Sequence, residues 1–472
     1  MWKRSKDTKD IEFRQVFVNT LDKLIMENPK ILVFEADLGG ASGTTKLKEK
    51  HSKQFVQVGI SEANMIGMAA GTSIRGYVPF VHTFSPFTTR RALDQIFIAG
   101  AYSGNTLNIY GSDPGFCAGA NGGTHSTYDD ISTMRNIPGT TVLAPADSVC
   151  FEWCMMEVSK IKGVNYIRGN RKANPKIYED GSTFELGKGN ILREGSDIVI
   201  YTMGELVLFA LEAADILDKK GIDVEVIDMF SIKPFDRDLV ISETCDKKLA
   251  ITFENHNVLG GLGSTVAEIM TENGISTPLH RIGVDNRFGQ VGNPEDQRKD
   301  YGLTSERIVN EVIDFLKGWY MDITKIIKKE NISIIDKKLN WKEAIRLAAS
   351  PLVEQGYVEK RYPEEIIKNT LEFGPYYILV EDVAFLHVRP EQGVISDQIG
   401  ILLNKIPVSF SKGDKSKDVK LFITFAAECS ENHLEIMQLL AEILGDEDKI
   451  KSLLDSVDEN EIYNLITNFW NK

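Results

Sequence analysis

Residues 57–71 read Gln-Val-Gly-Ile-Ser-Glu-Ala-Asn-Met-Ile-Gly-Met-Ala-Ala-Gly, and this stretch decides the fold of the first part of the chain. The apolar residues Phe55, Val56 and Val58 predict a short strand that runs into a glycine. Ser61 is then expected to cap a helix, which places Glu62 in the first helical turn. A carboxylate there usually interacts with the helix dipole. Beside a face of small residues, it can also have a raised pKa and transfer protons.

Apolar strands alternate with amphipathic helices outward from this stretch, from residue 11 to about residue 170. The expected strands each combine a short apolar run with helical patterns on either side: Ile31–Glu35, Phe55–Val58, Val78–Val81, Leu107–Tyr110, Thr141–Leu143 and Val164–Ile167. This alternation is typical of a parallel, doubly wound α/β sheet. We therefore predict such a domain over residues 10–172.

A second parallel, doubly wound α/β domain is predicted over residues 185–318. Its expected strands are again short apolar runs, at Ile198–Tyr201, Val224–Ile227, Ala250–Phe253 and Leu279–Ile282. Helices are expected near 205–219 and 263–273. The glycine run at 260–264 opens the second of these helices, where it could bind an anion. Close packing of the strand against the helix is the simpler expectation.

A charged stretch at 319–339 is predicted to be a solvated linker, and residues 340–472 are predicted to form a third α/β domain. Helices are expected at 341–356, 363–373, 431–444 and 448–470, and strands at 376–380, 396–403 and 420–425.

Composition limits the function. The chain has 472 residues and a net charge of −14, which argues against binding to nucleic acid. Five scattered cysteines indicate a reducing compartment, and no metal site is expected from them. The charged N-terminus lacks the apolar core of a signal peptide, and no run of 18 apolar residues occurs. We expect a cytoplasmic protein.

Residues 57–71 resemble the pyrimidine-binding domain of transketolases, with the pattern Gly-Ile-x-Glu-x-x-Met, and the resemblance continues for roughly 310 residues. It implies that Glu62 is catalytic and protonates a ring nitrogen of the aminopyrimidine of thiamine diphosphate. It also implies that Phe84 and Phe87, in Thr83-Phe-Ser-Pro-Phe87, line that ring, as aromatic faces do well.

The glycine-rich loop from Gly111 ends in Thr124-His125, which matches the Gly-x-Thr-His of transketolases. The resemblance implies that His125 contacts the donor ketose. Asn121 stands where many relatives have an aspartate that binds an acceptor hydroxyl, and Asp113 stands where many have a phosphate-binding histidine. Both differences indicate an unusual ketose or acceptor, with Asp113 expected to repel phosphate. Arg168 matches the phosphate-binding arginine of the family, and its alternative role is a surface salt bridge.

The sequence lacks the Gly-Asp-Gly motif with which thiamine diphosphate enzymes hold Mg²⁺ and the diphosphate. The resemblance therefore implies a separate N-terminal subunit that carries the diphosphate-binding domain and Mg²⁺. The expected assembly is a heterotetramer with a homodimer of this chain, the cofactor lying between subunits, and sugar phosphates as substrates.

Residues 374–394 contain Leu386-His387-Val388-Arg389-Pro390. A neutral imidazole beside a guanidinium can accept a phosphoryl group. The stretch resembles enzyme IIA of sugar phosphotransferase systems, in the ascorbate-like branch of the mannitol/fructose class. It implies that His387 takes a phosphoryl group from phospho-HPr and passes it to enzyme IIB, which acts with IIC at the membrane. Arg389 would bind this group, and His433, at an expected helix start, would stabilise it.

Two alternatives to a transketolase subunit fused to enzyme IIA remain open. The first part could be the β-subunit of a 2-oxoacid dehydrogenase, which shares the domain layout, although the Gly-Gly-Thr-His loop favours transketolase. It could also be an inert regulatory scaffold that the phosphohistidine controls.

Overall fold

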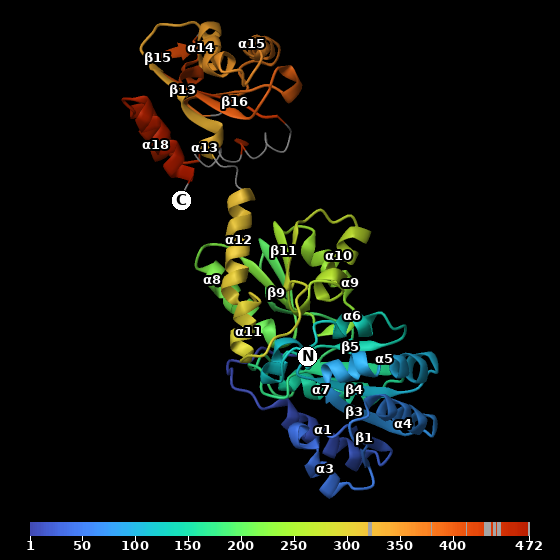
Figure 1. Ribbon diagram of the computed structural model, residues 1–472. Coiled ribbons are helices and arrows are strands. Elements are labelled where there is room, and N and C mark those ends of the chain that lie inside the picture. Colours follow the sequence, from blue (N-terminus) through green and yellow to red (C-terminus); the bar gives the residue numbers. More distant parts are fainter. Residues whose placement is uncertain are drawn as a thin grey trace. The chain divides into compact units, whose positions relative to one another are not determined.

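The computed structural model describes residues 1–319, 323–378, 380–411, 413–428, 436–437, 440 and 445–470. The chain forms two compact units, Met1–Ile313 and Asp314–Lys472, and each is described by itself. The first unit holds both of the doubly wound domains that the sequence predicts (Figure 1).

The first sheet has the strand order β10-β5-β6-β4-β3-β1-β2, and all neighbours are parallel except β10, which runs antiparallel to β5. The strands are β1 (Ile31–Glu35), β2 (Phe55–Gln57), β3 (Val78–Phe84), β4 (Leu107–Ser112), β5 (Thr141–Leu143), β6 (Val164–Gly169) and β10 (Ser231–Lys233). Every residue of β1 and β4 is buried, because helices cover both faces of the sheet.

The helices of this domain lie on both sides of the sheet (Figure 1). They are α1 (Phe13–Glu27), α2 (Gly39–Ser42), α3 (Thr45–Lys50), α4 (Glu62–Ile74), η1 (Phe87–Arg91), α5 (Leu93–Gln95), η2 (Ile96–Tyr102), η3 (Gly115–Asn121), α6 (Asp130–Arg135) and α7 (Ser148–Val158). One core joins α4 to Phe34 and Val81 of the sheet. On the other face, Phe13 of α1 stacks on Phe151 of α7 with ring centroids 4.8 Å apart.

The second sheet has the order β12-β11-β8-β9-β7, parallel except for the edge strand β7. Its strands are β7 (Asn190–Arg193), β8 (Ile198–Thr202), β9 (Val224–Asp228), β11 (Leu249–Asn257) and β12 (Leu279–Val284). The accompanying helices are η4 (Gly204–Leu206), α8 (Val207–Asp218), α9 (Arg237–Thr244), α10 (Leu262–Glu272), α11 (Pro294–Asp300) and α12 (Ser305–Trp319).

The expected strands of both domains are confirmed, with ends that differ by a few residues. The sequence did not predict β7 and β10, which are short antiparallel edge strands of three or four residues. Ser61 precedes α4 as expected, but it makes no capping bond to the helix. Its hydroxyl instead donates to the carbonyl of Val58, at 2.9 Å.

The glycine run at the start of α10 is a packing site. Leu262 and Gly263 donate their backbone N–H groups to the carboxylate of Glu254, both at 2.8 Å. A Cβ at Gly261 would lie 2.0 Å from the same carboxylate. The helix N-terminus therefore already holds an anion of this chain, which confirms the expectation of close packing.

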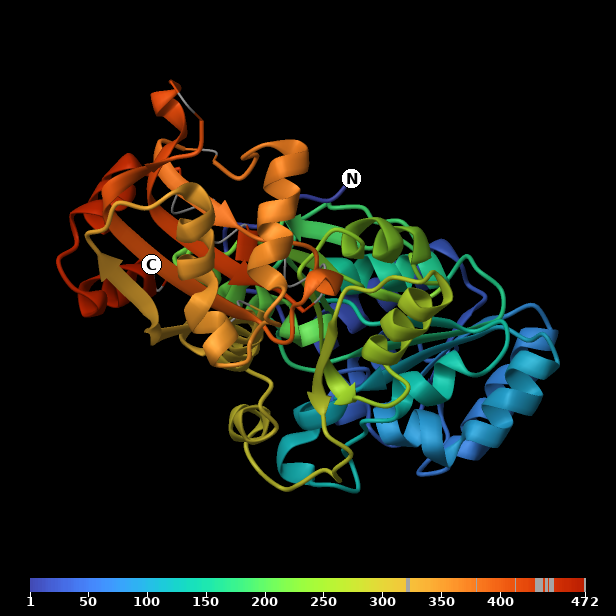
Figure 2. The ribbon, with the colours of Figure 1, turned by 90° about the horizontal axis from the view of Figure 1, so that it is seen from above.

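The unit Asp314–Lys472 contains a mixed sheet of order β13-β15-β16-β14, in which β15 and β16 are antiparallel and the outer pairs are parallel. Its elements are α13 (Ile323–Ile326), β13 (Ile327–Ile335), α14 (Trp341–Glu354), α15 (Tyr362–Phe373), β14 (Asp382–Leu386), η5 (Pro390–Gln392), β15 (Gln398–Ser409), η6 (Lys415–Lys417), β16 (Asp418–Ala426), α17 (Glu447–Asp455) and α18 (Glu459–Trp470). Helix α14 packs against the sheet, and α15 packs beside α14 (Figure 2).

The predicted linker at 319–339 differs from the structure, since Ile327–Ile335 forms strand β13 at the edge of this sheet. Ile327 and Ile332 are buried there, while the intervening lysines and glutamate face outward and hid the strand pattern. The strand expected at 376–380 lies instead at 382–386. The single helix expected at 448–470 is divided into α17 and α18. Most of the expected helix 431–444 lies outside the described residues.

Candidate active sites

Glu62 lies at the first residue of α4 and is 2% exposed. Arg91 donates from Nη1 to the Oε1 atom of Glu62 at 2.7 Å. The other oxygen, Oε2, is buried and has no hydrogen-bond partner within the described residues. A buried carboxylate oxygen without a partner is uncommon, and it identifies the place where a ligand atom could bind.

Arg91 closes the π-helical turn η1, which begins at Phe87. Its guanidinium carbon lies 3.9 Å from the centre of the Phe87 ring, a cation–π contact. Single π-helical turns are frequent at functional sites. The sequence reasoning missed Arg91, although its spacing of four residues from Phe87 was a signal that the two side chains meet.

Three aromatic rings meet next to this ion pair. Phe84, at the end of β3, and Phe87 lie edge to face, with centroids 6.1 Å apart. The imidazole of His125 lies 5.6 Å from Phe84 and 5.1 Å from Phe87. Its Nδ1 is 2.9 Å from the hydroxyl of Thr124. The structure thus brings Phe84, Phe87 and His125 together, and Arg91 connects them to Glu62.

The glycine-rich loop before His125 packs against the second domain. Gly119 adopts φ 56°, which glycine tolerates and larger residues rarely adopt. A Cβ on Gly123 would lie 2.4 Å from the carbonyl oxygen of Gly289. These two glycines therefore allow close contact between domains. Asn121 is exposed at the end of η3, and its role toward an acceptor stays a prediction.

Asp113 does not face solvent as a free negative charge. It is 3% exposed, and its Oδ2 lies 2.5 Å from Nε of Arg171. The backbone N–H of Arg171 donates to Oδ1 at 2.8 Å. Burial raises the pKa of the Asp113 carboxyl, and Arg171 opposes this rise. The sequence predicts that Asp113 repels phosphate, but the positive charge of Arg171 offsets the charge of this carboxylate. The sequence reasoning missed Arg171.

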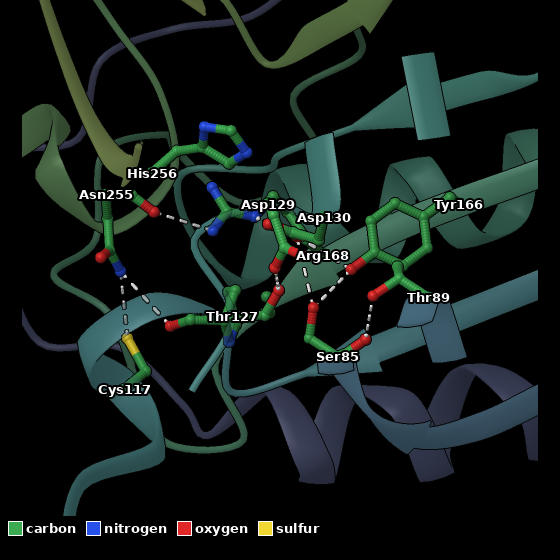
Figure 3. Close-up of polar contacts among 12 residues, drawn as sticks. Ser85, Thr89, Cys117, Thr127, Asp129, Asp130, Tyr166, Arg168, Asn255 and His256 are labelled. Carbon is green, nitrogen blue, oxygen red and sulfur yellow. Dashed lines mark hydrogen bonds and ion pairs between the residues drawn. The ribbon is translucent and has the colours of Figure 1, made fainter. Parts of the chain in front are cut away.

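Arg168 is 3% exposed, so the alternative of a surface salt bridge does not hold. Its Nε lies 3.0 Å from Oδ2 of Asp130, and its Nη2 donates to the backbone carbonyl of Asn255 in the second domain at 3.0 Å (Figure 3). The hydroxyl of Tyr166 donates to the same Asp130 oxygen at 2.9 Å. The guanidinium joins the two domains, and its expected role in phosphate binding stays a prediction.

His387 follows directly after β14 in the second unit and is half-buried. Its ring stacks on Phe425 of β16 at 4.9 Å, and Tyr376 meets it edge-on at 5.9 Å. Its Nδ1 lies 3.0 Å from the carbonyl oxygen of Phe385. A carbonyl only accepts, so Nδ1 carries the proton, and in the neutral ring the lone pair is on Nε2.

A pocket of about 620 Å³ opens at His387, and Arg389 lies on its wall. Its lining also includes Asn369, Phe373, Tyr376, Val388, Glu391 and Gln392. Gln392 fixes the loop, because its side-chain oxygen accepts from the backbone N–H of Arg389 at 3.1 Å and its amide donates to Glu365 at 3.2 Å. His387 and Arg389 thus share one pocket. His433 lies outside the described residues.

The described ranges contain neither a metal cluster nor a membrane-spanning helix. No group of three or more His, Cys, Asp and Glu side chains there is placed to hold a metal ion. No helix in those ranges is both long enough and apolar enough to cross a bilayer.

Family models match three successive parts of the chain. "Transketolase, pyrimidine binding domain" matches residues 9–175 and "Transketolase, C-terminal domain" matches 187–308. "Phosphoenolpyruvate-dependent sugar phosphotransferase system, EIIA 2" matches 325–469. The chain belongs to the transketolase family, and it carries a phosphotransferase-system EIIA domain at its C-terminal side.

Similar proteins sharpen this assignment. The chain is 39% identical over 296 residues to the "6-deoxy-6-sulfo-D-fructose transketolase subunit SqwH" of Clostridium sp. (strain MSTE9), covering 63% of this chain and 92% of that protein. It is 33% identical to an apulose-4-phosphate transketolase subunit of Phocaeicola vulgatus, covering 65% and 98%. A solved "Split gene transketolase, inactive beta4 tetramer" is 33% identical, with a TM-score of 0.60, and covers 66% of this chain and 99% of its own.

Transketolase-family domains imply thiamine diphosphate and a divalent metal in the family. The residues around Glu62 fit one end of that cofactor. The unpartnered Oε2 atom can exchange a hydrogen bond with a ring nitrogen, and Arg91 connects Glu62 to the apolar rings of Phe87 and Phe84. The fit concerns the pyrimidine end of the cofactor.

Proposed function

We propose that Met1–Ile313 is one subunit of a split transketolase and uses thiamine diphosphate shared with a second subunit. The observation that carries this proposal is the buried Oε2 of Glu62, which has no described partner; Arg91 connects Glu62 to the cluster of Phe87, Phe84 and His125 rings. The second subunit would supply the diphosphate-binding domain and Mg²⁺, and two copies of each chain would form a heterotetramer.

In this proposal, each residue has a separate task. Thiamine diphosphate, when bound, supplies the nucleophilic carbon for two-carbon transfer. Glu62 holds or moves a proton at Oε2, while Arg91 fixes Oε1. Phe84 and Phe87 hold the flat ring and exclude water. His125 exchanges hydrogen bonds with the ketose, and the Thr124 hydroxyl orients its ring.

The substrates are proposed to be sugars with an anionic end group. The Clostridium relative is named for 6-deoxy-6-sulfo-D-fructose and the Phocaeicola relative for apulose 4-phosphate. Both names describe a sugar that carries a sulfo or phosphate group. The Gly-Gly-Thr-His125 loop and these relatives favour a transketolase over the β-subunit of a 2-oxoacid dehydrogenase.

Reconstitution tests this half of the proposal. The chain is mixed with a purified diphosphate-domain subunit of a split transketolase, thiamine diphosphate and Mg²⁺, and ketose cleavage is followed by product analysis. We expect activity only when both subunits are present. Ketol transfer by this chain alone would contradict the shared site. A complex that binds the cofactor but transfers no carbon would support the inert scaffold instead.

We also propose that the third domain relays a phosphoryl group through His387. The Nε2 lone pair would attack the phosphorus of phospho-HPr, so one P–N bond breaks as another forms. Arg389 would bind the phosphoryl oxygens. The thiolate of a cysteine on enzyme IIB would then take the group, which returns His387 to its neutral form. The Nδ1 contact with the Phe385 carbonyl supports this role, because it keeps the lone pair on Nε2.

Phosphoryl transfer can be measured with radiolabelled phosphoenolpyruvate, enzyme I and HPr. We expect one acid-labile phosphate on the chain, lost when IIB is added. Mass spectrometry should place it on His387. Labelling of the chain when HPr is omitted would contradict the relay. Labelling of a histidine other than His387 would also contradict it.

A further inference from the structure

One face of helix α15 meets the pocket of His387. Tyr362, Glu365 and Asn369 follow one another at intervals of three and four residues, which places them on the same face of the helix. Asn369 also lines the pocket. The helix itself is anchored, because its apolar residues are buried in the core of the second unit. A polar helix face therefore has a fixed position beside the histidine.

Tyr362 contacts the backbone next to both stacked rings of the pocket. Its hydroxyl donates to the carbonyl of Phe425 at 2.6 Å, and the ring of Phe425 stacks on the imidazole of His387 at 4.9 Å. The backbone N–H of Val388, the residue after the histidine, approaches the same hydroxyl. Tyr362 is completely buried, and burial raises the pKa of its hydroxyl, which therefore remains a hydrogen-bond donor.

Glu365 and Asn369 hold the loop that carries Arg389, and they do so through Gln392. The amide of Gln392 donates to the Oε2 atom of Glu365 at 3.2 Å. The side-chain amide of Asn369 donates to the Oε1 atom of Gln392 at 3.4 Å. The same Oε1 atom accepts the backbone N–H of Arg389 at 3.1 Å. One face of α15 thus supports the backbone at both polar residues of the proposed relay.

We propose that Tyr362, Glu365 and Asn369 are positioning residues for the phosphoryl transfer. Tyr362 sets the backbone on both sides of the stacked rings. Glu365 and Asn369 act through Gln392 and set the backbone of the arginine. This inference rests on the proposed phosphoryl relay. Transfer requires the attacking nitrogen, the phosphorus and the leaving group in line, so a small rotation of the imidazole lowers the rate while the docking surface for HPr is kept.

The main test measures transfer from phospho-HPr to the full chain. Tyr362→Phe keeps the buried ring and removes only the hydroxyl. We expect kcat, taken per folded chain, to fall about tenfold with the KM for phospho-HPr unchanged, as for a small misplacement of reacting groups. Tyr463→Phe, at a half-buried tyrosine of α18, is the matched control and should transfer at the wild-type rate. A wild-type kcat for Tyr362→Phe would overturn the proposal.

Glu365 allows a rescue experiment. Glu365→Leu removes the acceptor of the Gln392 amide and should lower kcat by about threefold or more, as for loss of a hydrogen bond to a charged group. Glu365→Gln keeps a side-chain oxygen at the same place and should recover most of this loss. An equal loss in both variants would show that the hydrogen bond does not position the loop, and it would overturn the role of Glu365.

A spectroscopic readout separates the positioning role from the relay itself. In the full chain with nitrogen-15 histidine, His387 should carry its proton on Nδ1, which lies 3.0 Å from the Phe385 carbonyl oxygen. In Tyr362→Phe, we expect a mixture of the two tautomers. If phospho-HPr labels no histidine of the wild-type chain, the proposed relay fails and this spectrum decides alone. A shifted tautomer ratio would support the positioning role, and identical spectra would overturn it.

Discussion

The sites around Glu62 and His387 differ in how far the key side chain is buried and in the residues that contact it. Glu62 is 2% exposed, and an arginine holds one of its oxygens. His387 is half-buried, packs against aromatic rings and lies on an open pocket with the exposed Arg389. The first arrangement suits a proton held away from water, and the second suits a group that must pass between proteins. Burial and the choice of partner thus distinguish the two candidate sites of this chain.

The largest expected effect is at His387. His387→Ala should reduce labelling by phospho-HPr to the assay background, because the pocket loses its nucleophile. The labelling is measured by radiolabel on the full chain. His280→Ala changes a partly exposed histidine of the first unit and is the matched control. Undiminished labelling of His387→Ala would show that His387 is not the phosphoryl acceptor, and the proposed difference between the two sites would then fail.

Glu62→Gln tests the buried site. The amide keeps the size of the side chain but does not release a proton, so kcat of the reconstituted complex should fall about 10²- to 10⁴-fold, as for loss of a general acid–base group. Steady-state kinetics measures this. Asp94→Asn, on the exposed surface of the short helix α5, serves as the control. Phosphorylation of His387 should be unchanged in both variants, and full transketolase activity of Glu62→Gln would contradict the role of Glu62.

Arg168→Met distinguishes a structural arginine from a substrate-binding one. It leaves Asp130 as a buried charge without its cation, so the free energy of unfolding of the first unit should fall by about 3–5 kcal/mol. Denaturant unfolding followed by fluorescence measures it. The paired change Arg168→Met with Asp130→Asn should recover part of the loss. Unchanged stability together with a raised KM for anionic donors would instead favour the phosphate-binding role.

Tyr376→Phe should have the smallest effect. The hydroxyl of Tyr376 makes a long contact of 3.4 Å with the His387 carbonyl and a side-chain hydrogen bond with Asn369, whereas its ring packs against the imidazole. Removing the hydroxyl should change the rate of phosphorylation by about threefold or less, because only neutral hydrogen bonds are lost and the ring stays in place. Tyr376→Ala, which also removes the ring, should slow it more. Equal rates for both variants would show that ring packing does not orient His387.

The core strands were predictable because buried strands of a parallel sheet are continuous apolar runs. Val33 and Phe34 are both buried, as such a strand requires. Strand β13 was not predictable from the sequence, because its lysines and glutamate face outward at a sheet edge and give the segment the composition of a linker. The short antiparallel strand β10 was also missed, since it completes the sheet of the other domain. Edge positions are set by partners distant in sequence.

Local motifs were enough to propose the main residues of the two candidate sites: Glu62, Phe84, Phe87, His125 and His387. The structure brings the first four of them together. The state of the charged groups, in contrast, became visible only in the folded chain. Arg168 forms a buried ion pair with Asp130, while Arg171 pairs with Asp113 at the end of a neighbouring strand. The partner of a charge depends on which strand ends become neighbours, and no local pattern encodes that.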